Sequence, residues 1–183
     1  MLLRVMTVSI ACALPLLTAC GGKESAAPES FTVVAPASLA GDSELVSAKG
    51  DVVVTVMRAG EKPLTLDLRT IEQLREVSYR VRDPYAKREI TYSGVLFSDL
   101  LEHLGSKALP AKIRLSAWDD YAVTITLADA RRWPVMLATR MDGKRMALRD
   151  GGPTRIVFPY HAFTIDPTRY NDQWIWSIKQ IEA

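Results

Sequence analysis

The sequence has little cysteine, and its two thiols, Cys12 and Cys20, both lie near the N-terminus. If the chain is cut before Cys20, the remainder holds no second cysteine for a disulfide, and a lipidated Cys20 leaves no free thiolate. Histidine is equally scarce, since His103 and His161 are the two copies and neither belongs to an HExxH pair. We therefore expect both imidazoles at or near the surface, and we expect no metal site.

Common catalytic signatures are also missing. The chain contains no GxSxG, P-loop or GxGxxG stretch, so the usual hydrolase and nucleotide-binding patterns are absent. Charge is nearly balanced: without Arg4, the 23 cations fall to 22 against 21 carboxylates, which leaves a net charge of +1. A surface so close to neutral provides no basic field for nucleic acid, and we expect no nucleic-acid partner.

The first 20 residues have the pattern of a bacterial lipoprotein precursor. Arg4 supplies positive charge, residues 5–17 are mostly apolar, and the small-residue run LTAC ends at Cys20. We expect a signal peptide over 1–19, lipid on Cys20 and a location on the periplasmic side of a membrane. Gly21, rather than Asp, slightly favours the outer membrane. An uncleaved membrane anchor is the alternative, but the apolar run is shorter than the ~20 residues of a spanning helix.

Residues 20–50 are predicted to form a flexible tether, followed by one domain over 51–183. The segment 21–30, GGKESAAPES, is small and polar and has little apolar surface to bury. A flexible coil of about 30 residues reaches roughly 30 Å on average. Fully stretched it spans roughly 100 Å, so a partner across a periplasm would require an extended chain.

The domain alternates strand patterns with short helical patterns. Strands are predicted over 52–56, 64–66, 78–82, 90–92, 113–117, 121–125, 135–141, 155–158 and 174–181. Helices are predicted after an Asp67 cap, over 95–104, and after the Thr126 to Asp129 capping box. Many strands with short, separated helices predict an α+β domain with mixed sheets.

Several blocks in this domain are similar to one known family. The stretch 94–101 (GVLFSDLL) resembles the helix entry of the sulfite-oxidase-type molybdopterin-binding fold. The stretches 137–143 (LATRMDG), 149–159 (RDGGPTRIVFP) and 176–181 (WSIKQI) match further blocks in the same order. The resemblance covers residues 51–182 and is greatest to short, stand-alone members of the fold.

Two departures from the enzymes of this family point to a non-catalytic protein. The oxidases bind molybdenum through a cysteine upstream of the Gly-Val block, whereas residues 78–93 contain none. The enzymes also hold the cofactor's phosphate with a loop containing lysine and glycine, whereas residues 160–166 (YHAFTID) contain neither. The resemblance therefore implies a pterin ligand without molybdenum, and no catalytic residue is expected.

The resemblance also implies which residues contact the pterin. The 2-amino group and N3–H of a pterin are donors that a carboxylate can accept together. Asp150 is the first candidate, with a simple turn residue as the alternative. Arg155 falls on a pterin-contact position, with a strand-surface ion pair as its alternative, and Gly152 lies in the same block.

Other candidates come from turns and aromatic positions. Asp119 and Asp120 lie at a predicted hairpin tip beside Tyr121, where adjacent aspartates also form Asx turns. Arg140 and Arg149 flank a predicted turn, and cross-strand salt bridges are their equal alternative.

Three aromatic residues, Tyr160, Trp174 and Trp176, provide a possible stacking surface. Trp174 and Trp176 are expected on the same side of one strand. We expect one of the two indoles to belong to the core.

Three functions remain open at this point. The favoured one is a lipid-anchored, pterin-binding module that regulates a membrane-bound sensor, such as a cyclic-di-GMP enzyme (diguanylate cyclase or phosphodiesterase) or a histidine kinase. This role is implied by short periplasmic members of the family. The alternatives are a molybdopterin-dependent oxidoreductase that lacks the usual cysteine ligand, and a scaffold lipoprotein whose pocket has decayed.

Overall fold

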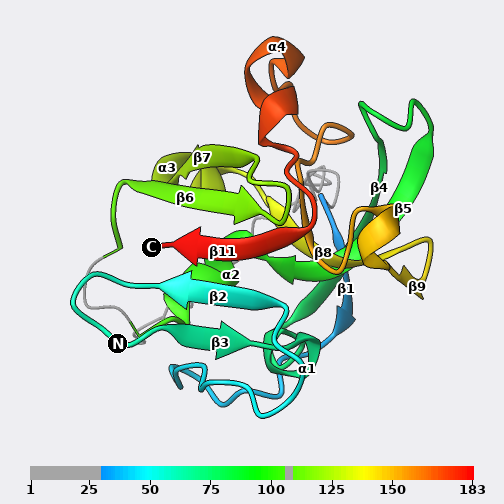
Figure 1. The fold of residues 1–183 in the computed structure, drawn as a ribbon. Helices are drawn as coiled ribbons and strands as arrows, with labels where there is room; N and C mark the ends of the chain where they lie inside the picture. Colours follow the sequence, from blue (N-terminus) through cyan, green and yellow to red (C-terminus); the bar gives the residue numbers. More distant parts are fainter. Residues whose placement is uncertain (1–29, 106–108) are drawn as a thin grey trace, which may run out of the picture.

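The computed structural model describes residues 30–105 and 109–183, which form two β-sheets with short helices (Figure 1). The first sheet has the order β1-β4-β5-β8-β10, with β9 paired to β8. Its strands are β1 (Thr32–Ala35), β4 (Glu76–Arg82), β5 (Glu89–Leu96), β8 (Met136–Met141), β9 (Lys144–Arg145) and β10 (Arg155–Val157). The predicted signal peptide and Cys20 lie outside the described residues.

The second sheet has the order β3-β2-β11-β6-β7. Its strands are β2 (Val54–Met57), β3 (Leu64–Leu66), β6 (Lys112–Ala117), β7 (Ala122–Thr126) and β11 (Ile178–Glu182). The central strand β11 runs parallel to β2 and antiparallel to β6. The expected α+β class with mixed sheets is therefore confirmed.

The helices are short, and side chains cap the N-termini of three of the four described α-helices, α1, α3 and α4. They are α1 (Leu68–Ile71), α2 (Phe97–Glu102), α3 (Leu127–Arg132) and α4 (Pro167–Tyr170), with 3₁₀ turns η1 (Leu148–Asp150) and η2 (Asn171–Gln173). The predicted caps are confirmed, since Asp67 accepts from Thr70 N at 2.7 Å and Thr126 accepts from Asp129 N at 3.0 Å. No helix among the described residues is long and apolar enough to cross a membrane.

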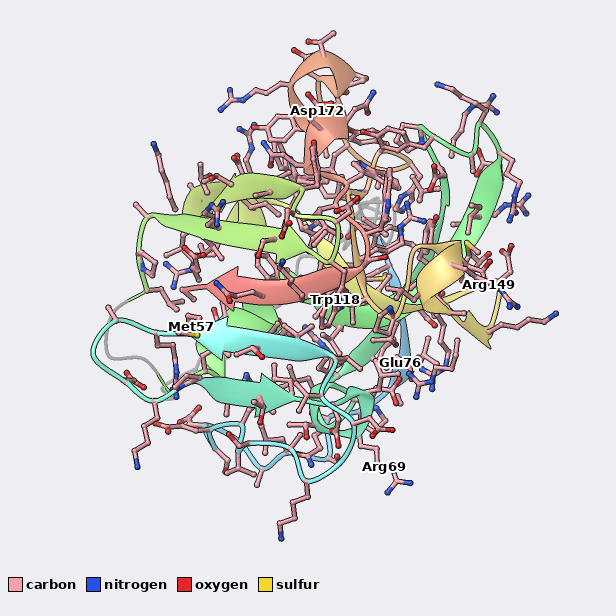
Figure 2. The ribbon with its side chains drawn as sticks, in the orientation of Figure 1. Met57, Arg69, Glu76, Trp118, Arg149 and Asp172 are labelled. Carbon is pink, nitrogen blue, oxygen red and sulfur yellow. The ribbon has the colours of Figure 1, made fainter. Side chains whose placement is uncertain are left out.

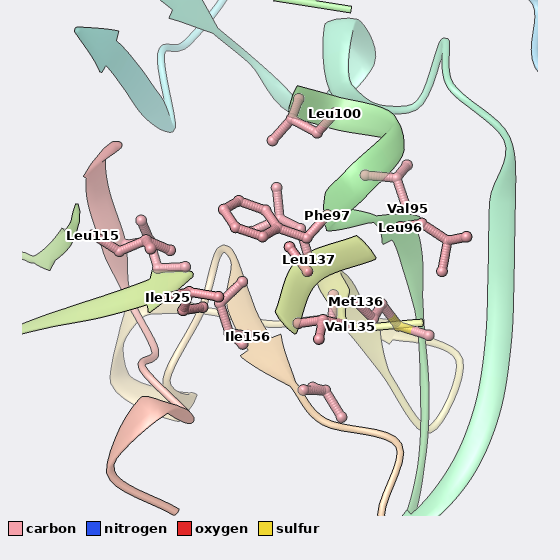
Figure 3. Packing of buried hydrophobic residues seen from close by; sticks show 14 of the residues in the cluster. Val95, Leu96, Phe97, Leu100, Leu115, Ile125, Val135, Met136, Leu137 and Ile156 are labelled. Atoms are coloured by element: carbon pink, nitrogen blue, oxygen red, sulfur yellow. The ribbon is translucent and has the colours of Figure 1, made fainter. Parts of the chain in front are cut away.

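Both sheets and α2 bury their apolar residues in one core (Figure 3). Phe97 and Leu100 of α2 point into it, together with Leu115 of β6, Leu137 of β8 and Ile156 of β10. All five of these side chains are fully buried, so the core holds the two sheets together.

Most predicted elements have somewhat different bounds in the structure, and two of the differences have a clear physical cause. The helix predicted from residue 95 begins at Phe97, because Val95 and Leu96 continue β5 and pair with Leu137 and Met136 of β8. The strand predicted over 174–181 begins at Ile178, because Ser177 adopts φ 52° and interrupts the extended chain. Cross-strand pairing and one left-handed residue therefore override the local patterns.

The predicted tether is shorter than expected, because described residues before position 51 pack on the domain. β1 pairs with β4, with Thr32 opposite Ser78. Leu45 is buried and its N–H donates to His103 O at 2.8 Å. Backbone pairing of β1 at the edge of the first sheet and the burial of Leu45 explain the difference, whereas Val33 and Val34 stay exposed. Sequence composition does not reveal such long-range matches.

Candidate functional site

A cavity of about 240 Å³ lies where the β6–β7 hairpin, the loop after β4 and the segment before β11 come together. Its lining is mainly aromatic and consists of Tyr85, Ala117, Asp119, Tyr121, Trp174 and Trp176. We call this cavity the aromatic cleft. Asp119 supplies the charged side chain of this lining, and no cationic residue belongs to it. A planar ligand with hydrogen-bond donors on one edge fits this combination of π-faces and carboxylate.

Backbone geometry at the β6–β7 turn fixes one wall of the aromatic cleft. Asp119 Oδ1 accepts from Tyr121 N at 3.1 Å, which confirms the predicted Asx turn. Asp120 adopts φ 65° and its carboxylate binds Lys179 Nζ at 2.6 Å. Tyr121 OH donates to the Asp172 carbonyl at 2.8 Å. Contacts on both sides therefore hold the turn in place. Asp119 and Tyr121 lie at the aromatic cleft, whereas the Asp120 carboxylate is paired with Lys179.

The opposite wall is Trp176, which lies between β10 and β11. It forms an isolated bridge with Arg155, and its ring meets Tyr85 edge to face at 5.1 Å. Ser177, at φ 52°, accepts from Trp118 N at 3.0 Å and donates to Gly151 O at 3.3 Å. In Figure 2, Trp118 accordingly lies close to the start of β11. The left-handed turn at Ser177 separates Trp176 from the strand and leaves its indole at the aromatic cleft.

A buried carboxylate joins these walls. Asp83, 1% exposed, accepts from the backbone N–H groups of Tyr85 at 2.8 Å and Ala86 at 2.7 Å. Its other oxygen accepts from Tyr92 OH at 2.6 Å and from Arg155 Nη2 at 3.2 Å. One side chain therefore ties the loop that carries Tyr85 to the strand residue that bridges Trp176.

The hydrogen bonds keep Asp83 ionised. Burial raises the pKa of the Asp83 carboxyl, but hydrogen bonds from Tyr92, Ala86 and Tyr85 and the charge of Arg155 together lower the pKa below its ordinary value. Burial raises the pKa of the Tyr92 phenol, which stays protonated and donates. Asp83 therefore carries its negative charge beside Arg155 at neutral pH.

Arg155 lies directly behind the aromatic cleft. Its guanidinium is 5.2 Å from the centre of the Tyr92 ring and 5.8 Å from that of Trp176. The Nε atom of Arg155 and the indole Nε1 of Trp174 are buried and have no hydrogen-bond partner among the described residues.

Four of the expected site residues lie directly at the aromatic cleft, namely Asp119, Tyr121, Trp174 and Trp176. Arg155 is behind it, and Tyr160 packs against Trp174 with ring centres 5.4 Å apart. Burial raises the pKa of Tyr160 to about 12, and its hydroxyl lies 3.0 Å from Asn171 Oδ1. Tyr160 thus packs against Trp174 without lining the cleft itself.

The RDGG block borders the aromatic cleft but does not line it. Asp150 and Arg149 have side chains 51% and 87% exposed, and their charged atoms are 3.8 Å apart. Gly152 is packed so tightly that a Cβ atom would lie 2.2 Å from Met146 O. A Cβ on Gly151 would lie 3.4 Å from Trp176. Gly152 is therefore required by packing and Gly151 by its φ of 78°, while both charged side chains point into solvent.

Arg140 lies away from the aromatic cleft, in an ion-pair cluster. Its Nη1 atom is 2.7 Å from Glu72 Oε1 and 2.8 Å from Glu76 Oε1. Arg145 also binds Glu72. Arg140 therefore forms salt bridges, which was its alternative role. Its partners are Glu72 at the end of α1 and Glu76 of β4, rather than a residue across the β8–β9 turn.

Two residues of the site were not singled out from the sequence, Asp83 and Tyr85. The signal for them is the Asp-Pro pair between two predicted strands, because an aspartate there commonly caps a turn through its side chain. That pattern predicts a turn, but it does not predict that the same carboxylate binds Arg155, which is 72 residues away.

The described residues lack the thiolate through which the oxidases bind molybdenum. They contain no cysteine, and no group of three His, Cys, Asp or Glu side chains among them is arranged to hold a metal ion. Asp83 is the buried carboxylate of residues 78–93, and both of its oxygens are already occupied. The aromatic cleft, in contrast, suits a pterin ring.

Comparisons with known proteins agree with this fold. No curated protein sequence matches the chain significantly. Among solved structures, 28 chains match. One is the crystal structure of the sulfane dehydrogenase SoxCD from Paracoccus pantotrophus, with a TM-score of 0.55 and 16% identity. The match covers 78% of this chain but 40% of that one, so it shows the shared fold alone.

A family model decides the classification. The model of the oxidoreductase molybdopterin binding domain matches residues 46–167, which is more than half of the sequence. This stretch carries the GVLFSDLL and RDGGP blocks and most of the aromatic cleft. The chain therefore belongs to the oxidoreductase molybdopterin binding domain family.

Proposed function

We propose that this protein binds a pterin in the aromatic cleft without a molybdenum centre, and that it does so as a regulatory module rather than as an enzyme. The observation that carries this proposal is the lining of the cleft: four aromatic side chains and one carboxylate, with no cation. The pterin stacks on the indole and phenol rings, and its 2-amino and N3–H donors face Asp119.

The missing cation favours a ligand without a phosphate group. Phosphate binding in proteins relies on Arg, Lys or exposed backbone N–H groups. The cleft volume of about 240 Å³ is below the ~300–1,000 Å³ of sites for drug-sized ligands. A bicyclic ring with a short side chain suits this volume better than a complete, phosphorylated molybdopterin.

The anchor and the partner follow from the N-terminal pattern and from the family resemblance. We place the protein on the periplasmic side of a bacterial membrane, attached through lipid on Cys20. Its partner is a membrane-bound signalling protein, such as a diguanylate cyclase, a phosphodiesterase or a histidine kinase. Ligand occupancy of the aromatic cleft is the signal that this partner receives.

Titration with tetrahydropterin and with oxidised pterin tests the ligand. Binding is expected to quench the fluorescence of the cleft tryptophans. Trp176→Ala removes one stacking face and is expected to weaken binding roughly 5- to 100-fold. Trp118→Ala is the matched control, because Trp118 is exposed, adjacent and absent from the cleft lining. Equal losses in both variants, or no pterin binding by the wild type, would refute the proposed site.

Mass spectrometry of small molecules released from protein purified from a cofactor-producing host separates the alternatives. A pterin with molybdenum at background supports the regulatory module. Stoichiometric molybdenum with a phosphorylated pterin supports the oxidoreductase. An empty cleft together with no heat on pterin titration supports the scaffold.

A further inference from the structure

One end of the first sheet carries a concentration of positive charge. We call it the basic tip, and it comprises the β4–β5 hairpin and the adjoining β8–β9 turn (Figure 1). Its exposed cations are Arg80, Arg82, Lys87, Arg88 and Lys144, against the exposed carboxylates of Glu89 and Asp142. The formal charge of the whole sequence is +2, so the basic tip accounts for its excess of positive charge.

Ion pairs inside the basic tip leave several cations unneutralised. Arg88 binds Asp142 at 3.0 Å, and Arg80 lies 3.8 Å from Glu89. Arg82, Lys87 and Lys144 have no ion pair among the described residues. Unpaired cations gathered at one end of the domain attract an anionic surface.

The N-terminal chain enters the first sheet from the direction of this same end. β1 is antiparallel to β4, with Thr32 opposite Ser78 and Ala35 opposite Glu76, so residues before Thr32 lie further toward the end of β4. His161 Nε2 donates to Ser30 O at 2.9 Å, and the His161 ring stacks on Tyr79 at 4.8 Å. Ser30 is therefore already beyond Ser78 and close to the basic tip.

We propose that the basic tip docks on the anionic lipid surface of the membrane that holds Cys20. This rests on the proposed lipid attachment. Ten residue steps separate Cys20 from Ser30, and they span at most about 35 Å. Two independent features, the charge and the point where the chain enters, therefore place the same end of the domain nearest the bilayer. The docked orientation also brings the loop carrying Tyr85, and with it the aromatic cleft, close to any membrane-bound partner.

Vesicle binding tests the docking without the lipid. The chain from residue 20 onward, with Cys20→Ser, is sedimented with phosphatidylcholine vesicles that contain or lack phosphatidylglycerol. We expect binding to the anionic vesicles, loss of binding in high salt and no binding to pure phosphatidylcholine. Arg82→Glu with Lys87→Glu is expected to reduce binding at least about tenfold.

The matched control is Lys62→Glu with Lys112→Glu, which changes the net charge equally in the loop between β2 and β3 and at the first residue of β6. In Figure 1 the β2–β3 loop and the start of β6 lie on the other side of the molecule from the β4–β5 hairpin. The control is expected to bind as the parent does, and all variants are expected to keep the parent's melting temperature and pterin affinity. No binding to anionic vesicles, or equal losses in both double variants, would overturn the docking. The parent protein could also fail to bind vesicles while the tip variant loses the response of the signalling partner. That result would assign the basic tip to an acidic protein surface instead of the membrane.

Discussion

Asp83→Ala is expected to destabilise the protein by about 3–5 kcal/mol, the cost of leaving one member of a buried ion pair alone. The substitution removes the acceptor of four hydrogen bonds at once and leaves the Arg155 guanidinium buried without its counter-charge. It also releases the loop that carries Tyr85 and the residue that bridges Trp176. We therefore expect pterin binding to be lost together with stability. Urea unfolding and pterin titration measure the two effects.

A double variant separates the ion pair from the fold around it. Asp83→Ala combined with Arg155→Met removes both charges, and replacing a buried pair by apolar residues is often close to neutral in stability. We expect the double variant to recover most of the stability that Asp83→Ala loses, while pterin binding stays weak because Arg155 is gone. If the two single effects simply add, the two side chains do not act as a pair.

Acid is expected to act through the same carboxyl. The pKa of Asp83 is lower in the folded protein than in the unfolded chain, so its contribution to stability is complete above the unfolded pKa near 4. The contribution is lost as the pH falls from that value through the folded pKa. Asp83→Asn lacks this ionisation and is expected to show a flatter loss of stability below about pH 4. Parallel acid-unfolding curves for both proteins would contradict this role.

Trp174→Ala is the second change with a large expected effect, again about 3–5 kcal/mol, because a buried indole leaves a large void. Trp174 is 1% exposed, meets Tyr92 edge to face at 6.4 Å and packs against Tyr160. It also lines the aromatic cleft, so binding is expected to fail with the fold. Thermal unfolding followed by circular dichroism gives the loss of stability.

The neighbouring tryptophan provides the contrast. Trp176 is 37% exposed, so Trp176→Ala is expected to cost only about 1 kcal/mol while still weakening pterin binding. Trp118, 58% exposed, is expected to change stability by less than about 0.5 kcal/mol. A large stability loss in Trp176→Ala would show that its indole belongs to the core rather than to the binding surface.

Trp174 and Trp176 show how far the sequence predicts the site. The expectation that one indole belongs to the core is correct for Trp174, whereas the expected shared strand face is wrong. Alternation along a strand assumes a continuous extended chain, and Ser177 breaks that assumption with φ 52°. Local patterns predict most strands and the helix caps at Asp67 and Thr126, because the hydrogen bonds and apolar faces of these elements involve residues close in the sequence.

Contacts between distant residues account for what the sequence did not predict. β1 joins the first sheet through residues more than 40 positions away, and Asp83 finds Arg155 across 72 positions. Nothing in the composition of residues 30–50 indicates such pairing. The same limitation applies to Asp119, whose place in the aromatic cleft depends on Tyr121 meeting Asp172.

The pairing of Asp83 with Arg155 also has an evolutionary consequence. A mutation that gave position 83 a thiol would leave the buried guanidinium without a counter-ion and free the N–H groups of Tyr85 and Ala86. A single step toward a thiolate centre at that position would therefore pass through a poorly folded protein. A thiolate could be accommodated at that position only if Arg155 changed at the same time, so the ion pair makes the residues allowed at positions 83 and 155 depend on each other.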